Sequence, residues 1–475
     1  MRTFVILALI LYGVRMGNLC SCIQEDLNEN NWPVLLAQEF KDHLDECMDD
    51  EKSSLVKSRF LVRPFSSTAL NAMEAEEEYQ LEVLCADLGG TSLKLDIYTV
   101  ASKTGNTEKV TKQTAKYDIP KTKEEIANRT IYEFMSEKII EFINDYQKAQ
   151  RTKGAPMKGA LTFSYPLEKC RGGFKVTKFT KQFNWVKAVT DNKPEMPLDE
   201  LNKLTDRYVR FSTIANDTTA LGIWACQTHE DAIGGFVLGT GMNCSYLDNI
   251  RKSKNMNEKK LKAIYNTECG GFKFSQVKSI MNHADIKINE SNPLEVDSYI
   301  LEKMVGGLYF EQYINIQFME ELARIAGDDH ANSVKNAGFW LKNGKLQPND
   351  LIEQIADVFE YIGLGYHFQK KMYRFITEAI SEAKDRKYKI CAGILAGVIY
   401  KSMESNPRKS TNYIFGLTGS GCKTEEFNSN VTRYITEILK VLCKSSTTEV
   451  SVEFKFSEEA SLQGAASSYA YKIYN

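Results

Sequence analysis

The amino-acid sequence predicts an α/β protein built of two lobes with a central cleft between them. The chain has 475 residues, about three times a typical domain length, which is enough for two sizeable cores. Apolar runs of strand length alternate with longer segments of helical periodicity. Two predicted strands, near residues 84–88 and 234–238, each run into a glycine-rich turn that suits an anion. Two similar half-structures that face each other would bring both turns to one ligand.

The N-terminal part of the chain predicts a targeting segment followed by a helix. Arg2 and Arg15 flank twelve uncharged, mostly apolar residues. This run is too short for a membrane-spanning helix, which needs about twenty residues, and it has the shape of a signal peptide over residues 1–22. An uncleaved interfacial anchor is the alternative interpretation. Within residues 23–80, apolar positions at helical spacing predict a helical segment that packs on the large lobe.

Beyond residue 80 the apolar pattern predicts strands and helices in alternation, which is the basis of the α/β class. In chain order they are a strand at 84–88, a hairpin of 93–100 and 112–119, a helix at 126–149, strands at 159–163 and 208–215, a second hairpin within 234–247, helices at 348–386 and 390–403, a strand at 413–417 and a helix at 424–444.

The first glycine turn is a candidate phosphate site. An apolar strand ends at Asp87 and turns on Gly89 and Gly90, which permit unusual φ angles and a close approach of the backbone to an anion. Thr91 and Ser92 add hydroxyl donors. Glycines between strands also occur for purely structural reasons, so an ordinary hairpin turn is the alternative.

The second glycine turn, residues 239–243, has the same character and follows another apolar strand. Between the two turns a strand ends at Asn216 and Asp217, where a helix starts. A carboxylate in this place suits a general base that takes the proton of a hydroxyl while its oxygen attacks a γ-phosphoryl group. A helix N-cap role for Asp217 is the alternative interpretation.

The composition excludes some classes of function. The formal net charge is −2 with 26% charged residues, so the chain lacks the basic field that nucleic-acid binding requires. The eleven cysteines have no regular spacing and no CxxC pair, which favours buried small hydrophobes over a structural zinc site. No segment predicts a stable membrane span.

The motifs resemble those of the hexokinase family in order, spacing and content over most of the chain from Leu81. Eight stretches carry the resemblance: residues 87–94, 161–166 (LTFSYP), 178–183, 216–218, 239–243, 266–270, 301–307 and 414–420. The resemblance implies the actin-like ATPase fold, which is ribonuclease H-like, with ATP in the cleft. It also implies a small lobe over residues 81–215, to which 450–475 return, and a large lobe over 216–449.

The resemblance implies a role for each matching residue. Asp217 would be the catalytic base, and the sugar would be held by Ser164, Thr180, Lys181, Asn216, Asn243, Glu268 and Glu302. ATP would contact Asp87, Gly89, Gly90, Thr91, Ser92, Lys94, Gly239, Thr240, Gly419 and Ser420, and Asp87 would reach Mg²⁺ through water. The implied activity is transfer of the γ-phosphoryl group of ATP to the 6-hydroxyl of glucose or a related hexose. Sugar binding would close the lobes and exclude water.

Four positions depart from the family pattern. Ser92 replaces the usual asparagine, Lys94 an arginine and Phe179 a tryptophan, and Thr418 stands where an acidic or amide residue is common. Lysine keeps the positive charge but loses the planar fork of arginine, which bears on nucleotide binding more than on phosphoryl transfer. These departures motivate one alternative, a non-catalytic sugar-binding or regulatory relative. A kinase for another hexose, such as an amino sugar, is a second alternative. A monomer and a homodimer both fit the sequence.

A hexokinase-like chain with a signal peptide resembles the exported hexokinases of microsporidian parasites. This resemblance predicts secretion, with a host cell as one destination. A cytoplasmic location is the alternative. Five N-x-S/T sequons are present, at Asn128, Asn216, Asn243, Asn289 and Asn430. Since Asn216 and Asn243 are predicted sugar ligands, a glycan on either would block the cleft.

Overall fold

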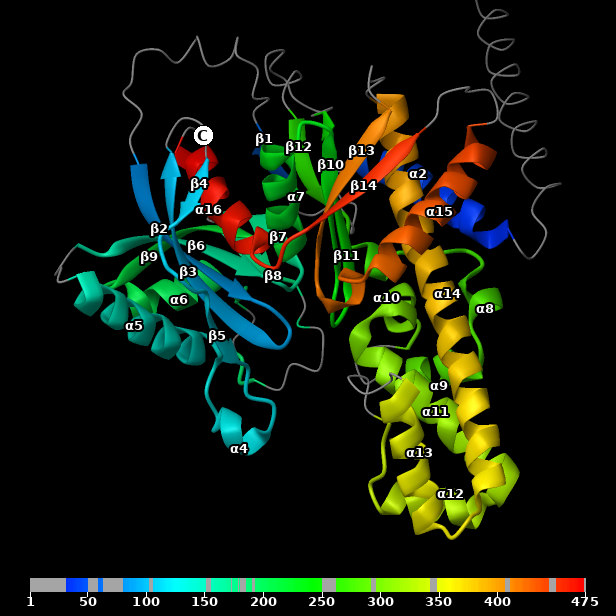
Figure 1. Cartoon of the computed structure of the whole chain (residues 1–475). Helices are drawn as coiled ribbons and strands as arrows, with labels where there is room; N and C mark the ends of the chain where they lie inside the picture. Colours follow the sequence, from blue (N-terminus) through cyan, green and yellow to red (C-terminus); the bar gives the residue numbers. More distant parts are fainter. Residues whose placement is uncertain are drawn as a thin grey trace, which may run out of the picture.

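The computed structural model describes most of the chain from residue 31 onward. The described residues are 31–49, 59–62, 80–101, 106–150, 155–171, 173–177, 179, 185–189, 193–249, 262–291, 296–341, 348–405, 411–443 and 450–473. The expected signal peptide at 1–22 and the predicted sugar ligands Thr180 and Lys181 lie outside them. Figure 1 shows two β-sheets beside each other and a helical arm that extends away from them.

The first sheet forms the core of the small lobe. Its strand order is β4-β3-β2-β6-β9, with β5 also paired to β3. Strands β2 and β3 are antiparallel, whereas β6 and β9 join β2 in parallel. The strands are β2 (Gln80–Leu88), β3 (Ser92–Ala101), β4 (Thr107–Lys109), β5 (Ala115–Asp118), β6 (Met157–Phe163) and β9 (Val209–Ala215). Beyond β6, the two-stranded ribbon of β7 (Leu167–Cys170) and β8 (Gly173–Val176) is separate from this sheet.

Helices cover both faces of the first sheet. On one face, α5 (Ile131–Gln150) and α6 (Pro197–Thr205) enclose the apolar side chains of β2, β3 and β6. On the other face, α16 (Ala460–Ile473) packs against residues such as Val83, Tyr98 and Val100. The C-terminal helix therefore completes a sheet whose strands begin nearly 400 residues earlier in the chain.

The second sheet is the core of the large lobe, with the order β1-β12-β11-β10-β13-β14. One face is covered by α7 (Asp217–Thr228), and the other by α2 (Trp32–Asp49), α14 (Tyr366–Ser405) and α15 (Glu425–Leu442). The strands are β1 (Arg59–Val62), β10 (Ala232–Leu238), β11 (Met242–Asn249), β12 (Lys262–Asn266), β13 (Asn412–Thr418) and β14 (Ser451–Phe456).

The two sheets repeat one topology. In each, an antiparallel hairpin holds a glycine turn, two strands follow in parallel, and a helix leaves the last strand. The hairpins are β2–β3 and β10–β11, and the corresponding helices are α7 and α16, which pack against each other. A Cβ on Gly464 of α16 would lie 1.8 Å from the carbonyl oxygen of Ala220 in α7. The two glycine turns thus occupy equivalent places in facing halves of the molecule.

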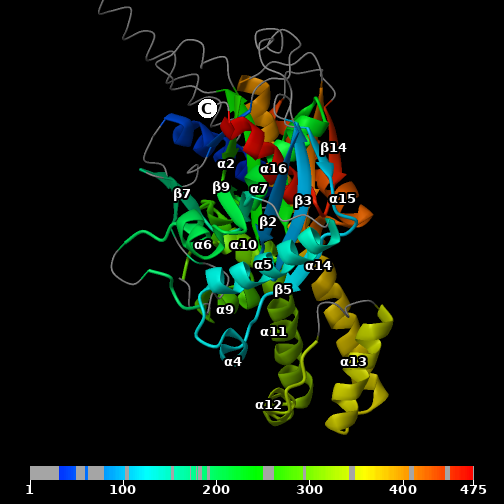
Figure 2. The ribbon, with the colours of Figure 1, turned by 90° about the vertical axis from the view of Figure 1, so that its left-hand side faces the viewer.

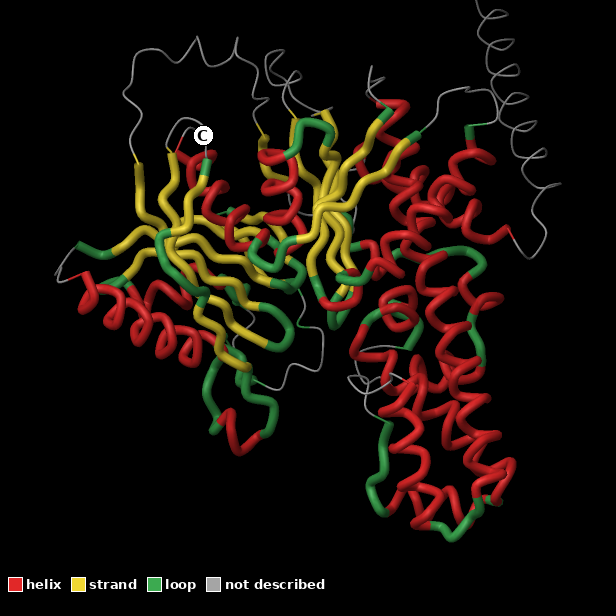
Figure 3. Tube along the Cα trace, viewed as in Figure 1, coloured by secondary structure: helices red, strands yellow, loops and turns green. Residues whose placement is uncertain are grey.

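A helical arm projects from the large lobe (Figures 1 and 2). It contains its own apolar cluster, built from α9, α11, α12, α13 and the first half of α14. Figure 3 shows that this arm is helical, whereas the strands gather in the two sheets. Its helices are α9 (His283–Ser291), α11 (Gly307–Ala326), α12 (Asp328–Asn336), α13 (Pro348–Tyr361) and the first half of α14, whereas α8 (Val277–Ile280) and α10 (Ile300–Val305) pack on the large-lobe core.

Two helix boundaries predicted from the sequence are wrong. The helix predicted at 126–149 begins only at Ile131, as α5, because Ile126 ends the short helix α4 (Lys123–Ile126), and Ala127 and Asn128 adopt left-handed φ angles of 50° and 58°. The predicted break at 387–389 is absent, since α14 continues through it. The chain instead turns at residues 362–365, between α13 and α14.

The N-terminal and C-terminal segments each contain a strand that the sequence did not predict, and both strands belong to the large-lobe sheet. Within residues 23–80, α2 buries Leu36, Phe40 and Leu44 completely, but the segment also adds strand β1 to the edge of the large-lobe sheet. Within residues 450–475, strand β14 pairs with β13 in the large lobe, and α16 alone crosses to the small lobe. No helix in the described ranges is long and apolar enough to cross a membrane.

Candidate active site

One cavity lies between the two sheets and gathers most of the predicted site residues. Fifteen of the eighteen predicted residues line it, from both lobes. Thr180 and Lys181 lie outside the described residues. Ser420 is absent from the lining, because it is the exposed first residue of the short helix η6 (Ser420–Cys422). The lining residues that the sequence prediction includes are Asp87, Gly89, Gly90, Thr91, Ser92, Lys94, Ser164, Asn216, Asp217, Gly239, Thr240, Asn243, Glu268, Glu302 and Gly419.

Asp217 lies where β9 gives way to α7. The N-cap of α7 is Asn216, whose Oδ1 accepts a 2.9 Å hydrogen bond from the backbone N–H of Thr218. The alternative of Asp217 as the N-cap is therefore wrong. Asp217 Oδ1 also accepts from that N–H, at 2.8 Å, and Oδ2 accepts a 2.7 Å bond from the Ser164 hydroxyl. A carboxylate held at both oxygens faces the cavity in a defined orientation, as a general base requires.

Amides and a carboxylate form a polar cluster on the large-lobe wall. The side-chain amide of Asn243 donates to Asn266 Oδ1 at 2.9 Å, and that of Asn266 donates to Glu268 Oε1 at 2.6 Å. Glu268 has a left-handed φ of 50°, which places its side chain at the end of β12 toward the cavity. Such groups match hexose hydroxyls, which donate and accept at once.

Glu302 reaches the same wall from α10. Its Oε2 accepts a 3.0 Å hydrogen bond from the backbone N–H of Met242, and the residue is 7% exposed. This contact requires a glycine at position 241, because a Cβ there would lie 2.2 Å from Glu302 Oε2. The second glycine turn and the Glu302 carboxylate therefore lie in direct contact.

The two glycine turns face the cavity with their backbone. In the first, the N–H of Gly89 donates to the carbonyl of Ser92 at 3.0 Å; in the second, the N–H of Gly239 donates to the carbonyl of Gly241 at 2.9 Å. Thr91 and Thr240 add hydroxyl groups to the lining. Such turns suit the phosphate oxygens of one nucleotide held from both lobes.

Asp87 has one oxygen with a partner and one without. Its Oδ2 accepts a 2.8 Å bond from the Ser461 hydroxyl, while Oδ1, within the described structure, is buried and has no hydrogen-bond partner. Burial raises the pKa of Asp87 to about 6; the Lys94 ammonium lowers it, and the Asp217 charge raises it. A carboxylate in the cavity wall with one oxygen not engaged by the described residues fits a magnesium ion bound through water.

Several lining residues were missed by the sequence prediction. Ser461 lies 374 residues from Asp87 in the chain, and nothing in its local sequence connects the two. Tyr299 lines the cavity from the N-cap of α10 with a φ of 53°. Asn266 is not among the lining residues, but from the end of β12 its side-chain amide donates to Glu268 Oε1 at 2.6 Å.

The fold has two lobes built on sheets of the same topology. The cavity between them combines an oriented carboxylate, a polar subsite suited to hydroxyl groups and two glycine turns. This combination is that of a two-lobed phosphotransferase that acts on a hydroxyl group. The chain belongs to the hexokinase family: two models, each described as hexokinase, match residues 35–226 and 233–471.

Relatives and solved structures agree with this assignment. Hexokinase-1 of Nicotiana tabacum is 23% identical over 342 residues, which cover 68% of this chain and 66% of that protein. Glucokinase-1 of Kluyveromyces lactis is 23% identical over 420 residues, covering 81% and 84% of the two chains. The hexokinase of Schistosoma mansoni complexed with glucose superimposes with a TM-score of 0.70 at 17% identity, covering 94% of this chain and 96% of that one. The expected two-lobed actin-like fold is confirmed.

Proposed function

We propose that the protein transfers the γ-phosphoryl group of ATP to the 6-hydroxyl of glucose or a related hexose. The observation that carries the proposal is the place of Asp217. Its carboxylate, held by Ser164 and Thr218, lies in one cavity with the amide and carboxylate cluster and with both glycine turns. A hydroxyl beside Asp217 would lose its proton to the carboxylate while its oxygen attacks the phosphorus.

The sugar-binding groups supply position and selectivity. Asn243, Glu268 and Glu302 offer donors and acceptors from the large lobe, and Ser164 offers its hydroxyl from the small lobe. A substrate that leaves one of these buried groups without a partner is penalised, which favours a hexose with matching hydroxyls.

ATP and Mg²⁺ complete the proposal. Asp87, whose Oδ1 has no hydrogen-bond partner among the described residues, would hold the ion through water, and the glycine turns that line the cavity would hold the phosphates. Bound Mg²⁺ would neutralise charge on the β- and γ-phosphates. Lys94 keeps a positive charge at the edge of this site, where its ammonium donates to the carbonyl of Glu458 at 3.1 Å.

Closure of the lobes on the sugar is part of the same proposal. Water resembles the sugar hydroxyl chemically, so an open cleft would allow ATP hydrolysis. The small lobe meets the large lobe where α7 and α16 pack, and the cavity lies between the sheets that these helices follow. Closure predicts that saturating glucose slows limited proteolysis of the connections between the lobes.

Secretion is proposed from the pattern of residues 1–22 alone. Expression in a eukaryotic secretory host, followed by N-terminal sequencing of protein from the medium, tests it. A cleaved chain in the medium supports secretion, and an uncleaved chain retained in the cells contradicts it.

The test of the proposed function is coupled ATP consumption by the purified full chain with glucose, mannose, fructose or glucosamine. An Asp217→Ala variant is compared with Asp206→Ala, a change at an exposed carboxylate that ends α6. Turnover that persists in Asp206→Ala and disappears in Asp217→Ala supports the proposal, and the sugar series identifies the substrate. Glucose binding without turnover in the wild type would instead support the non-catalytic alternative.

A further inference from the structure

A buried charged cluster lies outside the cavity, between the first sheet and α16. Asp96 of β3 has no exposed side-chain area, and it lies on the sheet face that α16 covers. Other residues on that face, such as Val83 and Val100, are apolar and pack against α16. A carboxylate in this position is costly unless it is paired, so its partners indicate what it does.

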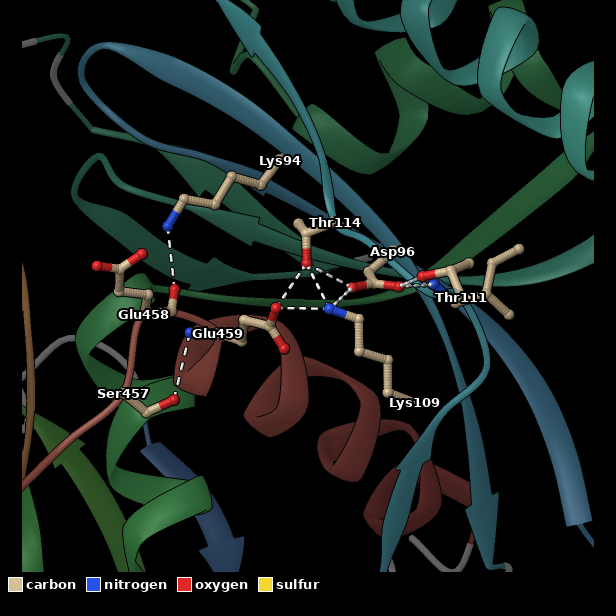
Figure 4. A network of polar contacts seen from close by, with 9 residues as sticks. Lys94, Asp96, Lys109, Thr111, Thr114, Ser457, Glu458 and Glu459 are labelled. Atoms are coloured by element: carbon tan, nitrogen blue, oxygen red, sulfur yellow. Dashed lines mark hydrogen bonds and ion pairs between the residues drawn. The ribbon is translucent and has the colours of Figure 1, made fainter.

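Lys109 and Thr114 lie between Asp96 and Glu459 and contact both carboxylates (Figure 4). The Lys109 ammonium lies 3.0 Å from Asp96 Oδ2 and 2.5 Å from Glu459 Oε1. It also donates to the Thr114 hydroxyl at 2.8 Å. That hydroxyl lies 2.7 Å from Asp96 Oδ2 and 2.8 Å from Glu459 Oε1. One ammonium therefore joins a buried carboxylate of the sheet to a carboxylate at the start of α16.

The other oxygen of Asp96 is also occupied. Asp96 Oδ1 accepts from the backbone N–H of Ile97 at 2.8 Å and from the Thr111 hydroxyl. With both oxygens bound, the side chain cannot turn away from Lys109. The position of Glu459 is therefore set by the β3–β4–β5 sheet edge.

Glu459 connects this cluster to the proposed magnesium site. It directly precedes α16, and its carbonyl accepts the N–H of Gln463 at 3.0 Å, which closes the first turn. Ser461 lies in that turn and donates to Asp87 Oδ2 at 2.8 Å. The carbonyl of Ser461 in turn faces the Thr162 hydroxyl at 3.4 Å. A continuous series of contacts thus leads from Asp96 through Glu459 and Ser461 to Asp87.

The neighbouring Glu458 makes contacts of a different kind. Its carboxylate pairs with Lys423 at 2.5 Å, but both side chains are about 60% exposed, at 64% and 60%. Exposed ion pairs of this kind contribute little. The contact of Glu458 with Lys94 uses its main-chain carbonyl, which a side-chain change leaves in place. Glu458 and Glu459 are therefore adjacent acidic residues with unequal structural roles.

We propose that Asp96, Lys109, Thr114 and Glu459 form a positioning cluster that fixes the first turn of α16, and through Ser461 holds Asp87 in the orientation that binds Mg²⁺. The inference rests on the proposed function, because it takes Asp87 as the magnesium carboxylate. The four residues do not touch the substrates. They act by keeping Asp87 Oδ2 bound to Ser461, which fixes the orientation of the carboxylate in the cavity wall.

The variant that tests this is Glu459→Ala. It cuts the link between the cluster and α16 and leaves Asp96 paired with Lys109 and hydrogen-bonded to Thr111, so no buried charge loses its counterion. Glu458→Ala is the matched control. Glu459→Gln is the conservative variant, since its amide oxygen still accepts from Thr114 and Lys109.

The readout is binding of the non-hydrolysable analogue AMP-PNP at saturating glucose, measured by isothermal titration calorimetry with and without Mg²⁺. We expect the Mg²⁺-dependent gain in affinity to fall about tenfold in Glu459→Ala, as for other residues that orient a metal-binding carboxylate. Glucose affinity and metal-free AMP-PNP affinity should stay at wild-type values. Glu458→Ala should match the wild type, and Glu459→Gln should keep most of the gain.

An unchanged Mg²⁺-dependent gain in Glu459→Ala would overturn the proposal, as would a parallel loss of glucose and metal-free nucleotide binding, which indicates general distortion. Failure of the proposed function looks different. In that case the wild-type protein itself neither phosphorylates a hexose nor binds AMP-PNP more tightly with Mg²⁺.

Discussion

The hydroxyl of Ser164 donates a 2.7 Å hydrogen bond to Oδ2 of Asp217, and so joins a sugar-binding motif directly to the proposed base. The two residues are 53 positions apart in the chain. They meet because β6 and β9 are neighbouring parallel strands whose carboxyl ends lie at the same edge of the sheet. The orientation of the base therefore depends on a residue of a different strand.

Replacing Ser164 by alanine should lower kcat about tenfold, because losing one hydrogen bond to a charged group costs about 1.5 kcal/mol. The KM for ATP should stay unchanged, since Ser164 contacts the base and the sugar subsite. Steady-state kinetics with glucose measure both constants. Ser136→Ala is the control, because that serine is also buried but donates within α5 to the carbonyl of Glu133. Equal kinetics in the two variants would contradict the role of Ser164.

Replacing Gly241 by alanine should weaken glucose binding by about tenfold or more. The new methyl group would lie 2.2 Å from Glu302 Oε2 and would displace the carboxylate from the Met242 N–H. Calorimetric titration with glucose measures the loss. Gly365→Ala is the matched control, since nothing lies within 4 Å of a Cβ at that position. Wild-type glucose affinity in Gly241→Ala would show that Glu302 is not held as described.

Replacing Asp87 by asparagine should stabilise the metal-free protein and abolish turnover. The folded-state pKa of Asp87, about 6, lies above its ordinary value of 3.8 because of burial. The folded state therefore binds the proton more tightly than the unfolded state, and stability falls as pH rises from about 4 to about 6. The full difference corresponds to about 3 kcal/mol. Above pH 6 the asparagine variant should be more stable than the wild type by about 1–3 kcal/mol.

Urea unfolding without Mg²⁺, at several pH values between 4 and 7, checks this prediction. The wild-type midpoint should fall with rising pH by more than the midpoint of Asp87→Asn. Parallel profiles for the two proteins would mean that Asp87 ionises normally in the folded state.

Replacing Gly464 by alanine should destabilise the protein by about 2 kcal/mol or more. Because a Cβ would lie 1.8 Å from the carbonyl oxygen of Ala220, α16 must move away from α7. Chemical denaturation of the variant, with Gly365→Ala as reference, gives the loss. Stability equal to the reference would require the two helices to separate without cost.

Glycan occupancy should follow the burial of the five sequons if the chain passes through a glycosylating secretory pathway. Asn216 and Asn289 are 3% and 5% exposed, so a glycan on either is incompatible with the folded structure. Asn128 is exposed in the turn between α4 and α5. Mass spectrometry of active secreted protein should find any glycan at Asn128 and none at Asn216. A modified Asn216 in active enzyme would contradict the site.

Local patterns predicted the fold and most of the cavity, because the glycine turns and the Asn216–Asp217 junction lie at strand ends with clear apolar runs before them. The division of the helix predicted at 126–149 also had a local signal. Thr122 with Glu125 forms a capping box, and Thr130 with Glu133 makes the same reciprocal bonds at the start of α5. Both patterns are visible in the sequence and mark the starts of α4 and α5.

Other features depend on tertiary packing and have no local signature. Ser461 contacts Asp87 because α16 returns to a sheet formed at the other end of the chain. The resemblance assigned residues 450–475 to the small lobe, but strand β14 joins the large-lobe sheet, and no local pattern shows which of two sheets a short strand joins. The cluster around Asp96 could not be predicted from local sequence either, since Lys109 and Glu459 are 350 residues apart in the chain.

The helical arm has a core of its own, centred on residues such as Phe318, Phe359 and Met372, and separate from the cluster under the large-lobe sheet. Units with separate cores open with separate free energies. The arm should therefore exchange its amide hydrogens in a cooperative step that leaves the two sheets protected. Destabilising mutations in the arm would then leave the catalytic centre intact. They would still increase degradation in a cell, because local unfolding of the arm is enough for cleavage by a protease.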